Sequence, residues 1–316
     1  MIKKREIPLY LFTGFLESGK TSFIIETLKE GQFEDGLYTL YILCEEGIEE
    51  IDKELLSRNR FETYVIEEEK DISPDLFKGL EKEKRPDRVI IEFNGTWDLD
   101  ALIEALPKQW IIGEGICTVD ASTYENYLNN MKMLMLQQFI YADLILFNRC
   151  REDMDLAMYK RTAHAKNRRA QVVFEMEDGS INNSVKEELP YDINSPVIEI
   201  GDEDYGLWYL DVFDNLDNYI GKTVRFKAQV FKPPKRKEDI FVPGRFAMTC
   251  CAEDIQFVGF PCKYAGAGKL KEKSYVNVTA EVRFGKQPGS EERVPALRAS
   301  LVEPAAPAED ELVYFT

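Results

Sequence analysis

A glycine-rich segment near the N-terminus constrains the fold of this chain more than any other feature of its sequence. Residues 14–21, GFLESGKT, fit the phosphate-binding pattern G-x-x-x-x-G-K-[ST] at every position. An apolar run at residues 8–13 precedes the segment, and residues 21–29 carry apolar side chains at helical spacing. A chance turn is the alternative interpretation, but a strand before the segment and a helix after it are the context that a phosphate-binding loop requires.

The residue types in this segment suit a bound triphosphate. Glycines let main-chain N–H groups curve around an anion, and the following helix points its positive end toward it. We expect Lys20 to reach the β- and γ-phosphates of a nucleotide, and Thr21 to hold Mg²⁺ through its hydroxyl group. The predicted nucleotide-binding residues of the segment are Gly14, Glu17, Ser18, Gly19, Lys20, Thr21 and Ser22.

Residues 1–185 alternate short apolar runs with helical patterns. This rhythm predicts an α/β domain of the P-loop NTPase type, with a mostly parallel sheet covered on both faces. Strands are expected at residues 8–13, 37–43, 88–93, 115–119, 143–147 and 171–174. Helices are expected at residues 21–29, 99–105 and 124–139, with a further helix beginning within residues 51–56.

The sequence changes character in its last third. Residues 186–205 are rich in acidic and turn-forming residues, which indicates a linker or a domain edge. Residues 206–316 show apolar side chains at period two and little helical pattern, which predicts a small all-β barrel domain of OB-like type. The expected strands of this domain lie at residues 223–232, 245–251, 255–264, 275–284 and 296–302.

Composition restricts the partners and the location that we expect. Hydrophobic residues make up 44% of the 316-residue chain and charged residues 31%, which is typical of a globular protein. A formal net charge of −17 disfavours nucleic acid and anionic membrane surfaces as partners. The N-terminus resembles a signal peptide only superficially, and no apolar stretch approaches the ~20 residues of a membrane helix. We therefore expect a cytoplasmic protein without direct membrane insertion, whose six cysteines are reduced thiols.

A carboxylate at the end of a second strand should complete a magnesium site. Glu92 ends the apolar strand at residues 88–93, and we expect it to hold Mg²⁺ or its bound water. Together with Lys20 it is predicted to be a catalytic residue. Gly95 could donate its N–H to a γ-phosphate. A solvated strand end is the alternative interpretation of Glu92.

Two other segments follow predicted strands of the same sheet. Glu45 lies in the segment CEEG and could belong to a switch that carries a magnesium-linked carboxylate. Asn148 and Arg149 follow the strand at residues 143–147, where a P-loop GTPase has its base-recognition signature. We include Asn148 and Arg149 in the predicted nucleotide site.

The order of these segments resembles that of the CobW-type metal-chaperone GTPases, relatives of the urease and hydrogenase maturation GTPases. The resemblance covers about residues 5–176 and implies GTP binding, hydrolysis, and coupling of the nucleotide to delivery of a metal or cofactor. The segments that carry it are GFLESGKT, CEEGIEEID (44–52), RVIIEFNG (88–95), TVDAS (118–122), ADLILFNR (142–149) and NRRAQVVFE (167–175).

The chain departs from the family pattern in two places. The CxCC metal motif of the family is absent, because residues 55–80 contain no cysteine or histidine. In the base signature Arg149 replaces lysine, and Arg151 stands where an aspartate would accept hydrogen bonds from guanine, which an arginine cannot do. Glu152 or Asp153 would have to take over that function. GTP therefore rests on the resemblance, and ATP remains an alternative.

The second half resembles a different family, the small two-cysteine domain of bacterial permease-associated proteins. The matching residues are 241–263, which include Cys250, Cys251 and Cys262. These thiolates could bind Zn²⁺ or another soft metal, with Glu253 or Asp254 as a further ligand. The alternative is that they are small buried apolar residues. The only histidine, His164, lies on a basic helical stretch and is interpreted as a surface residue.

Three functions are compatible with the sequence. The first is a magnesium-dependent GTP hydrolase of CobW type that couples binding or slow turnover to metal or cofactor delivery. The second is a non-hydrolysing nucleotide switch whose β domain docks a transporter or client protein. The third is a nucleotide-dependent kinase or transferase, but no acceptor site in the sequence supports it. The sequence leaves the oligomeric state open.

Overall fold

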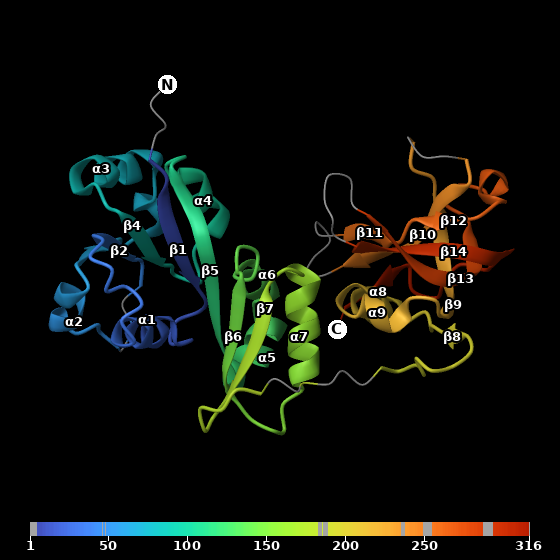
Figure 1. The fold of residues 1–316 in the computed structure, drawn as a ribbon, viewed down its shortest axis with the longest axis horizontal. Coiled ribbons are helices and arrows are strands. Elements are labelled where there is room, and N and C mark those ends of the chain that lie inside the picture. Colours follow the sequence, from blue (N-terminus) through green and yellow to red (C-terminus); the bar gives the residue numbers. More distant parts are fainter. Residues whose placement is uncertain are drawn as a thin grey trace. The chain divides into compact units, whose positions relative to one another are not determined.

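The computed structural model describes residues 5–45, 47, 49–182, 185, 189–234, 238–248, 255–286 and 293–315. The chain divides into two compact units, Met1–Val185 and Lys186–Thr316, which are described one at a time (Figure 1). Each unit is built around its own sheet. Among the described residues, no helix combines the length and the apolar character that crossing a membrane would require.

The first unit contains a seven-stranded sheet in which all neighbouring strands are parallel. This arrangement confirms the predicted α/β fold of P-loop NTPase type. The strand order is β3-β2-β4-β1-β5-β6-β7. The strands are β1 (Ile7–Thr13), β2 (Thr39–Leu43), β3 (Phe61–Val65), β4 (Arg88–Glu92), β5 (Trp110–Asp120), β6 (Leu144–Cys150) and β7 (Gln171–Met176).

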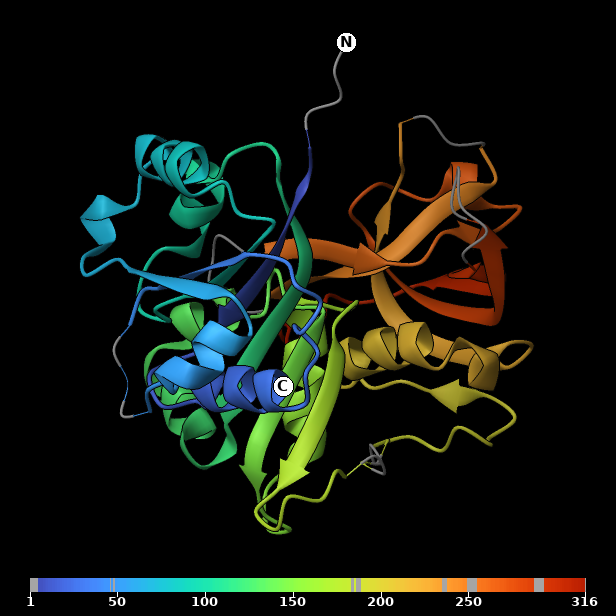
Figure 2. The same ribbon diagram turned by 60° about the vertical axis from the view of Figure 1, so that its left-hand side comes forward.

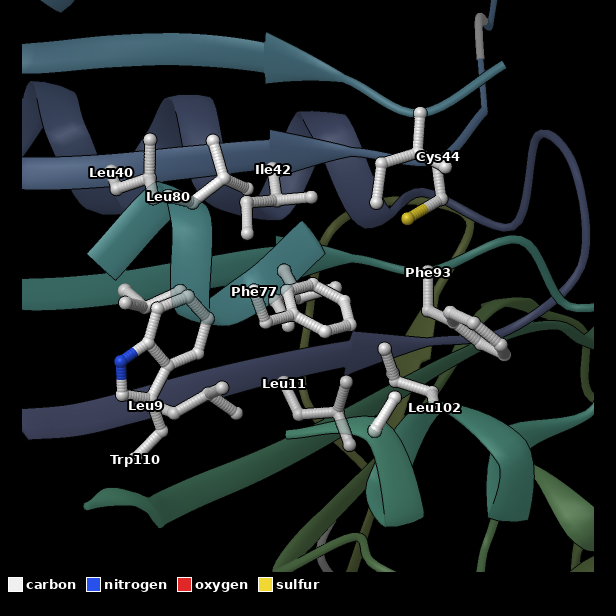
Figure 3. Close-up of a cluster of buried hydrophobic side chains, with 14 of the residues drawn as sticks. Leu9, Leu11, Leu40, Ile42, Cys44, Phe77, Leu80, Phe93, Leu102 and Trp110 are labelled. Atoms are coloured by element: carbon white, nitrogen blue, oxygen red, sulfur yellow. The ribbon is translucent and has the colours of Figure 1, made fainter. Parts of the chain in front are cut away.

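Two apolar clusters cover opposite faces of this sheet. Alternation along β1 sends Leu9 and Leu11 into the cluster that includes residues of α3 and α4, which Figure 3 shows in part. Phe12 points into the other cluster, with residues of α1. Figure 2 shows α1 and α2, in blue, in front of the strands. The helices are α1 (Lys20–Lys29), α2 (Lys53–Arg58), η1 (Glu69–Asp71), α3 (Pro74–Lys84), α4 (Leu99–Ala105), α5 (Ala121–Asn130), α6 (Lys132–Gln137) and α7 (Leu156–Lys166).

The first unit differs from the sequence-based prediction in several elements, and the short helix η1 is one that was not expected. The helix expected over residues 124–139 is two helices, because the backbone leaves helical geometry at Met131 (φ −136°) between α5 and α6. Strand β3 was not predicted, since it is short and mostly exposed. Helix α3 was also missed, although Ser73 caps it and Pro74 occupies its first turn, which are recognisable start signals.

The second unit is rich in β-strands, as predicted. The pairings β9–β10, β10–β12, β12–β14, β14–β13 and β13–β9 form a closed ring of five strands. Strands β8, β11 and β15 add to this ring. The strands are β8 (Ile198–Glu199), β9 (Thr223–Phe231), β10 (Ile240–Met248), β11 (Ile255–Gly259), β12 (Cys262–Lys263), β13 (Tyr275–Lys286), β14 (Arg293–Pro304) and β15 (Leu312–Val313).

Helices contribute more to the second unit than the sequence predicted. Helix α8 (Tyr205–Asp214) buries Trp208 completely, and the Trp208 ring lies 4.7 Å from that of Phe226 on β9. Helix α9 (Leu216–Tyr219) and the short η3 (Ala267–Lys269) are the other helical elements described. The strand expected over residues 255–264 is two strands, β11 and β12, each pairing with a different stretch of β10.

Candidate functional site

The phosphate loop, residues 14–21, connects β1 to α1. Its turns use left-handed backbone at Gly14 (φ 126°), Glu17 (φ 61°) and Gly19 (φ 99°). A Cβ atom on Gly14 would lie 2.3 Å from the carbonyl oxygen of Thr118, so the position requires glycine. Among the described side chains, none caps the N-terminus of α1. The first amide groups of this helix can therefore receive an anion.

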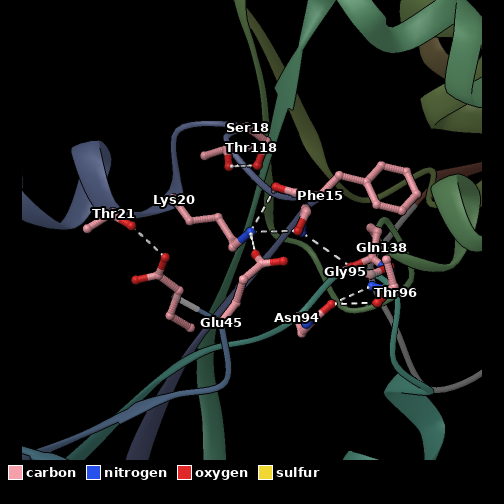
Figure 4. Close-up of polar contacts among 12 residues, drawn as sticks. Phe15, Ser18, Lys20, Thr21, Glu45, Asn94, Gly95, Thr96, Thr118 and Gln138 are labelled. Atoms are coloured by element: carbon pink, nitrogen blue, oxygen red, sulfur yellow. Dashed lines mark hydrogen bonds and ion pairs between the residues drawn. The ribbon is translucent and has the colours of Figure 1, made fainter. Parts of the chain in front are cut away.

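Lys20 is the first residue of α1, and only 3% of it is exposed. Its Nζ atom donates hydrogen bonds to the carbonyl oxygens of Gly14 and Phe15 and to Oε2 of Glu45, each at 2.8 Å (Figure 4). A buried ammonium group needs such partners, because burial without them would cost several kcal/mol or more. The structure thus brings Glu45 to Lys20 rather than to the hydroxyl group of Thr21.

Glu92 lies at the end of β4 and is 3% exposed, so it is not a solvated strand end. Thr21 Oγ1 donates to Glu92 Oε1 at 2.7 Å, and the Tyr41 hydroxyl donates to the other carboxylate oxygen. Burial raises the pKa of Glu92, and the two hydroxyl donors oppose that shift. Burial also raises the pKa of Tyr41, with a smaller contribution from Glu92. The structure thus brings together Thr21 and Glu92, two of the residues predicted to hold Mg²⁺, with Tyr41 as an additional partner.

Gly95 lies directly against the phosphate loop. A Cβ atom on Gly95 would be 2.5 Å from the Gly14 carbonyl oxygen and 2.9 Å from the Phe15 Cα atom. The side-chain amide of Gln138, which follows α6, contacts both segments: Oε1 accepts from Gly14 N at 3.2 Å, and Nε2 donates to Gly95 O at 3.0 Å. Gly95 was expected at the site from its place after a strand, whereas no motif in the sequence marks Gln138.

Asn148 and Arg149, at the end of β6, contact the outer side of the phosphate loop. Asn148 Nδ2 donates to the Ser18 carbonyl oxygen at 2.7 Å. Arg149 has left-handed backbone (φ 54°), and its Nη1 atom donates to Glu17 O at 3.1 Å and to Asp120 Oδ2 at 2.6 Å. The structure therefore brings both residues of the predicted base signature to the loop, and Asp120 is a partner that the prediction missed.

At the position where the family pattern has a guanine-reading aspartate, this chain has Arg151. Arg151 donates from Nε to Asp153 Oδ1 at 3.1 Å, and both side chains are exposed. Neither of them, nor Glu152, is among the residues that line the pocket beside the phosphate loop. An arginine at this position offers donors only.

A pocket of about 210 Å³ lies beside the phosphate loop and collects most of the predicted site residues. It contains the hydroxyl and carboxylate oxygens that Mg²⁺ prefers, supplied by Thr21, Glu45 and Glu92. Mg²⁺ usually takes one or two carboxylates together with substrate phosphates, so these residues fit that ion. The lining residues are Leu16, Glu17, Gly19, Lys20, Thr21, Ser22, Glu45, Gly47, Glu49, Glu92 and Arg149.

The remaining pocket contact concerns Ser22. Its Oγ atom donates to Glu49 Oε2 at 2.6 Å, so the hydroxyl group faces a carboxylate of the segment that follows β2. Ser18, in contrast, points away from the pocket toward β5, where its Oγ atom lies 2.9 Å from Thr118 Oγ1. Ser18 can therefore offer a ligand its main-chain amide more readily than its hydroxyl group.

The described cysteines behave as buried thiols. Cys262 lies on β12 with no exposed surface, and burial raises its pKa to about 12. The predicted metal ligands Cys250 and Cys251, with Glu253 and Asp254, lie outside the described residues. Within the described ranges, no group of three or more His, Cys, Asp or Glu side chains is placed to hold a metal ion. His164 lies on α7 and is partly buried, not a fully exposed surface residue.

Two family models match the chain. The model described as "CobW/HypB/UreG, nucleotide-binding domain" matches residues 8–176. The model described as "DUF1980 C-terminal domain" matches residues 175–315. None of the curated proteins compared with the chain matches it.

Solved structures similar to the chain include a hydrogenase maturation factor and a GTPase. The hydrogenase maturation factor HypB from Archaeoglobus fulgidus is 17% identical, covering 56% of this chain and 84% of HypB, with a TM-score of 0.39. The Zn(II)-bound YjiA GTPase from E. coli is 22% identical, covering 72% of this chain and 74% of YjiA, with a TM-score of 0.40.

Proposed function

Because the first family model matches more than half of its residues, this chain belongs to the CobW/HypB/UreG nucleotide-binding family, and on this premise we propose that it binds a nucleoside triphosphate with Mg²⁺ and hydrolyses it slowly. One observation carries the proposal. The ammonium group of Lys20 is buried at the start of α1, beside a pocket lined by oxygen donors. Phosphate oxygens are the ligands that such an arrangement suits.

Binding of a triphosphate would rearrange the contacts of Lys20. Glu45 supplies one carboxylate oxygen to its ammonium group, and Gly14 and Phe15 supply two neutral carbonyl oxygens. A triphosphate tail brings several anionic oxygens and can also accept from the amides at the start of α1, so it can displace Glu45. Release of Glu45 would free the segment that follows β2, which is how the predicted switch would sense the nucleotide.

The magnesium site would use the pair that is already formed in the pocket. Mg²⁺ would neutralise charge on the phosphates when bound. Thr21 would hold it through its hydroxyl group, and Glu92 would orient that hydroxyl group from Oε1. Tyr41 holds the other oxygen of Glu92 and so fixes the carboxylate. Once released from Lys20, Glu45 is the second carboxylate proposed for the magnesium site.

GTP is the proposed nucleotide because the chain belongs to this family and its sequence segments resemble those of the CobW-type GTPases. Asn148 and Arg149, which hold the outer side of the loop, are proposed to face the base and ribose. Arg151 provides no acceptor for the guanine edge, so ATP is retained as the alternative nucleotide. Competition between GTP and ATP for the purified chain decides between them.

Turnover is proposed to be slow without a partner. GTPases that lack a complete set of catalytic groups hydrolyse their nucleotide slowly until a second protein supplies what is missing. Lys20 would stabilise the developing charge on the phosphates, and Glu92 would act through Thr21. We propose that turnover is coupled to delivery of a metal or cofactor to a client protein.

A nucleotide switch without hydrolysis is the second candidate function. The lack of a CxCC motif in residues 55–80 favours it, because the family's cysteine route for a metal is then missing. In this version residues 206–316, joined through residues 186–205 to the nucleotide domain at residues 1–185, dock a transporter or client. The β9-β10-β12-β14-β13 ring supports assigning that domain to the OB-like barrels.

Calorimetric binding and phosphate release test the proposal together. Wild-type protein should bind GTP with Mg²⁺ and release phosphate at a slow rate, and Lys20→Ala should lose both. Tight binding with no phosphate release under any metal would select the switch. No binding heat for GTP or ATP would overturn both candidate functions.

A further inference from the structure

We propose that Gln138 is a positioning residue that couples the loop after β4 to the phosphate loop, so that the site distinguishes triphosphates from diphosphates. This inference rests on the proposed nucleotide function. Gln138 is not among the residues that line the pocket, and it acts through its hydrogen bonds to the main chain of Gly14 and Gly95. It is therefore not itself a catalytic residue.

The side chain of Gln138 is completely buried, and its amide is fully used. Oε1 accepts from Gly14 N at 3.2 Å, while Nε2 donates to Gly95 O at 3.0 Å and to Leu134 O at 3.2 Å. The Gln138 main-chain oxygen accepts from Thr13 Oγ1 at 2.9 Å. One residue at the end of α6 thus holds the end of β1, the first turn of the phosphate loop and the loop after β4. Figure 4 shows Gln138 beside Gly95 and Phe15.

The chemistry of this position calls for a carboxamide. The Gly14 amide needs an acceptor, and the Gly95 carbonyl needs a donor, from the same side chain. Glutamine offers both, whereas an ionised glutamate offers acceptors only, and a methionine of similar length offers no donor and only a weak sulfur acceptor. Buried main-chain groups that lose such partners are left unsatisfied.

The loop that Gln138 holds is rigid on its other side as well. Asn94 Oδ1 accepts from Thr96 N at 2.9 Å and from Thr96 Oγ1 at 2.7 Å. The peptide between Gly95 and Thr96 is therefore held at its oxygen by Gln138 and at its nitrogen by Asn94. The preceding amide, Gly95 N–H, makes no hydrogen bond to any described residue. It is the group proposed to meet a terminal phosphate.

The geometry implies a direct mechanical link. Gly95 lies so close to the Gly14–Phe15 main chain that a Cβ atom would overlap it, so the two loops cannot shift independently. A phosphate that accepts a hydrogen bond from Gly95 N–H would act on the hydrogen bond between the Gly95 carbonyl oxygen and Gln138. Through Gln138 it would also act on α6. A diphosphate lacks that terminal group. Gln138 should therefore contribute to triphosphate binding more than to diphosphate binding.

Equilibrium binding of GDP and of a non-hydrolysable GTP analogue, both with Mg²⁺, tests the proposal. In wild-type protein the analogue should bind more tightly than GDP. Gln138→Met should reduce that preference about tenfold, the loss expected when one hydrogen bond to a charged group is misplaced. The matched control is Gln137→Met, because Gln137 contacts Asp98 and not the phosphate loop, and it should leave the preference unchanged.

The possible outcomes distinguish a failure of the proposed nucleotide function from a failure of the role proposed for Gln138. Wild-type protein that binds neither ligand would overturn the proposed function itself. Wild-type preference that persists in Gln138→Met, or equal weakening of both ligands, would overturn the role of Gln138 alone. Hydrogen exchange on wild-type protein makes the test independent of variant folding. The α6 amides should be protected by the analogue and not by GDP, and equal protection by both would overturn the proposal.

Discussion

Both units of the molecule bury charged side chains, but they do so in different ways. In the first unit, Lys20 and Glu92 are buried beside a pocket, and their partners include side chains that also line it. In the second unit, Asp211 and Arg245 are equally buried, at 5% and 1% exposure, and neither lines the pocket beside the phosphate loop. Burying a charge costs free energy in both units. In the first unit the partners that offset this cost lie next to a candidate ligand site, and in the second unit they lie inside the fold.

The hydrogen-bond partners of Asp211 and those of Arg245 lie within the second unit. Asp211 accepts from Asn215 Nδ2 at 2.7 Å and from the Tyr219 hydroxyl, which lies 2.9 Å from the Tyr191 hydroxyl. Arg245 donates to the Asp310 carbonyl oxygen at 2.6 Å and so ties the C-terminal segment to β10. The Asp211 contacts join α8 to α9, and the Arg245 contact joins β10 to the C-terminal segment.

The contrast teaches what each charge is for. A buried charge whose partner can be displaced by a ligand belongs to a binding site, whereas one whose described partners all lie in the same core belongs to the fold, even where, as for Arg245 Nε and Nη1, some of its nitrogens make no hydrogen bond to the described residues. Substitutions in the first unit should therefore change affinity more than stability, and those in the second should do the reverse. The predictions below test that division.

The largest effect is expected for Lys20→Ala. Loss of two charge-assisted hydrogen bonds to phosphate, at about 1.5–3 kcal/mol each, should weaken nucleotide binding at least about 100-fold. The free energy of unfolding should change much less. Calorimetry and urea unfolding measure the two quantities. Lys29→Ala, an exposed lysine at the other end of α1, is the control and should bind normally. A large fall in the free energy of unfolding of Lys20→Ala with unchanged nucleotide affinity would contradict the assignment of Lys20 to a binding site.

The converse effect is expected for Asp211→Ala. It leaves Tyr219 and Asn215 without their acceptor in a buried place, which should lower the free energy of unfolding by about 2–3 kcal/mol. Nucleotide affinity should be unchanged. Urea unfolding of the full chain measures the loss. Asp217→Ala removes an exposed partner of Arg293 and should cost little. A reduced affinity in Asp211→Ala would show that the units do not divide these roles.

A smaller effect should follow from Glu45→Gln. This change removes the carboxylate that competes with phosphate for Lys20, so GDP affinity without Mg²⁺ should rise about fivefold, the equivalent of about 1 kcal/mol for one hydrogen bond. If Glu45 also joins the magnesium site, the gain in affinity on adding Mg²⁺ should shrink. Glu49→Gln removes an equal charge from the same pocket without touching Lys20. The same rise in both variants would assign the effect to general charge.

The smallest effect is a dependence of stability on pH. Burial raises the folded-state pKa of Glu92, so the folded protein binds that proton more tightly than the unfolded chain does. The stability this provides is present below the unfolded pKa of 4.5 and is lost as pH rises through the folded pKa. Glu92→Gln should therefore gain stability relative to wild type as pH rises from 4.5 toward neutrality.

Glu62 provides the opposite control. Its hydrogen bond with Lys84 lowers the pKa of Glu62, so its contribution is present above the unfolded pKa of 4.5 and is lost on acidification. Glu62→Gln should lose stability relative to wild type as pH rises from acid to neutral. Urea unfolding across that range compares the two variants. Parallel curves for both would contradict the assignment of Glu92 as a charge buried at a stability cost.

The sequence predicted the fold of the first unit because its signals are local. The phosphate loop, the strand ending at Glu92 and the strand before Asn148 are each contained in fewer than ten residues. The break at Met131 escaped prediction, because apolar residues continue at helical spacing on both sides of it. The β-rich second unit was predicted from period-two patterns, but the closure of its ring depends on which distant strands pair.

The site was predictable only where a motif marks it. Tyr41 and Gln138 belong to it through contacts with residues 51 and 124 positions away, and nothing in their neighbourhoods signals a polar role. Burial is decided by the assembled sheet, so the sequence could not select them. Whether Cys250 and Cys251 bind a metal stays a prediction, since both lie outside the described residues.

The contact between Lys20 and Glu45 also restricts which ligands can bind in the pocket. The carboxylate of Glu45 already binds the ammonium group of Lys20, which is the group that a phosphate would bind. A small inorganic ion that makes one contact with Lys20 gains too little free energy to displace Glu45. A ligand must bring many contacts at once. Millimolar orthophosphate or sulfate should therefore fail to compete with nucleotide, and effective competition by either ion would show that the carboxylate does not guard the cation.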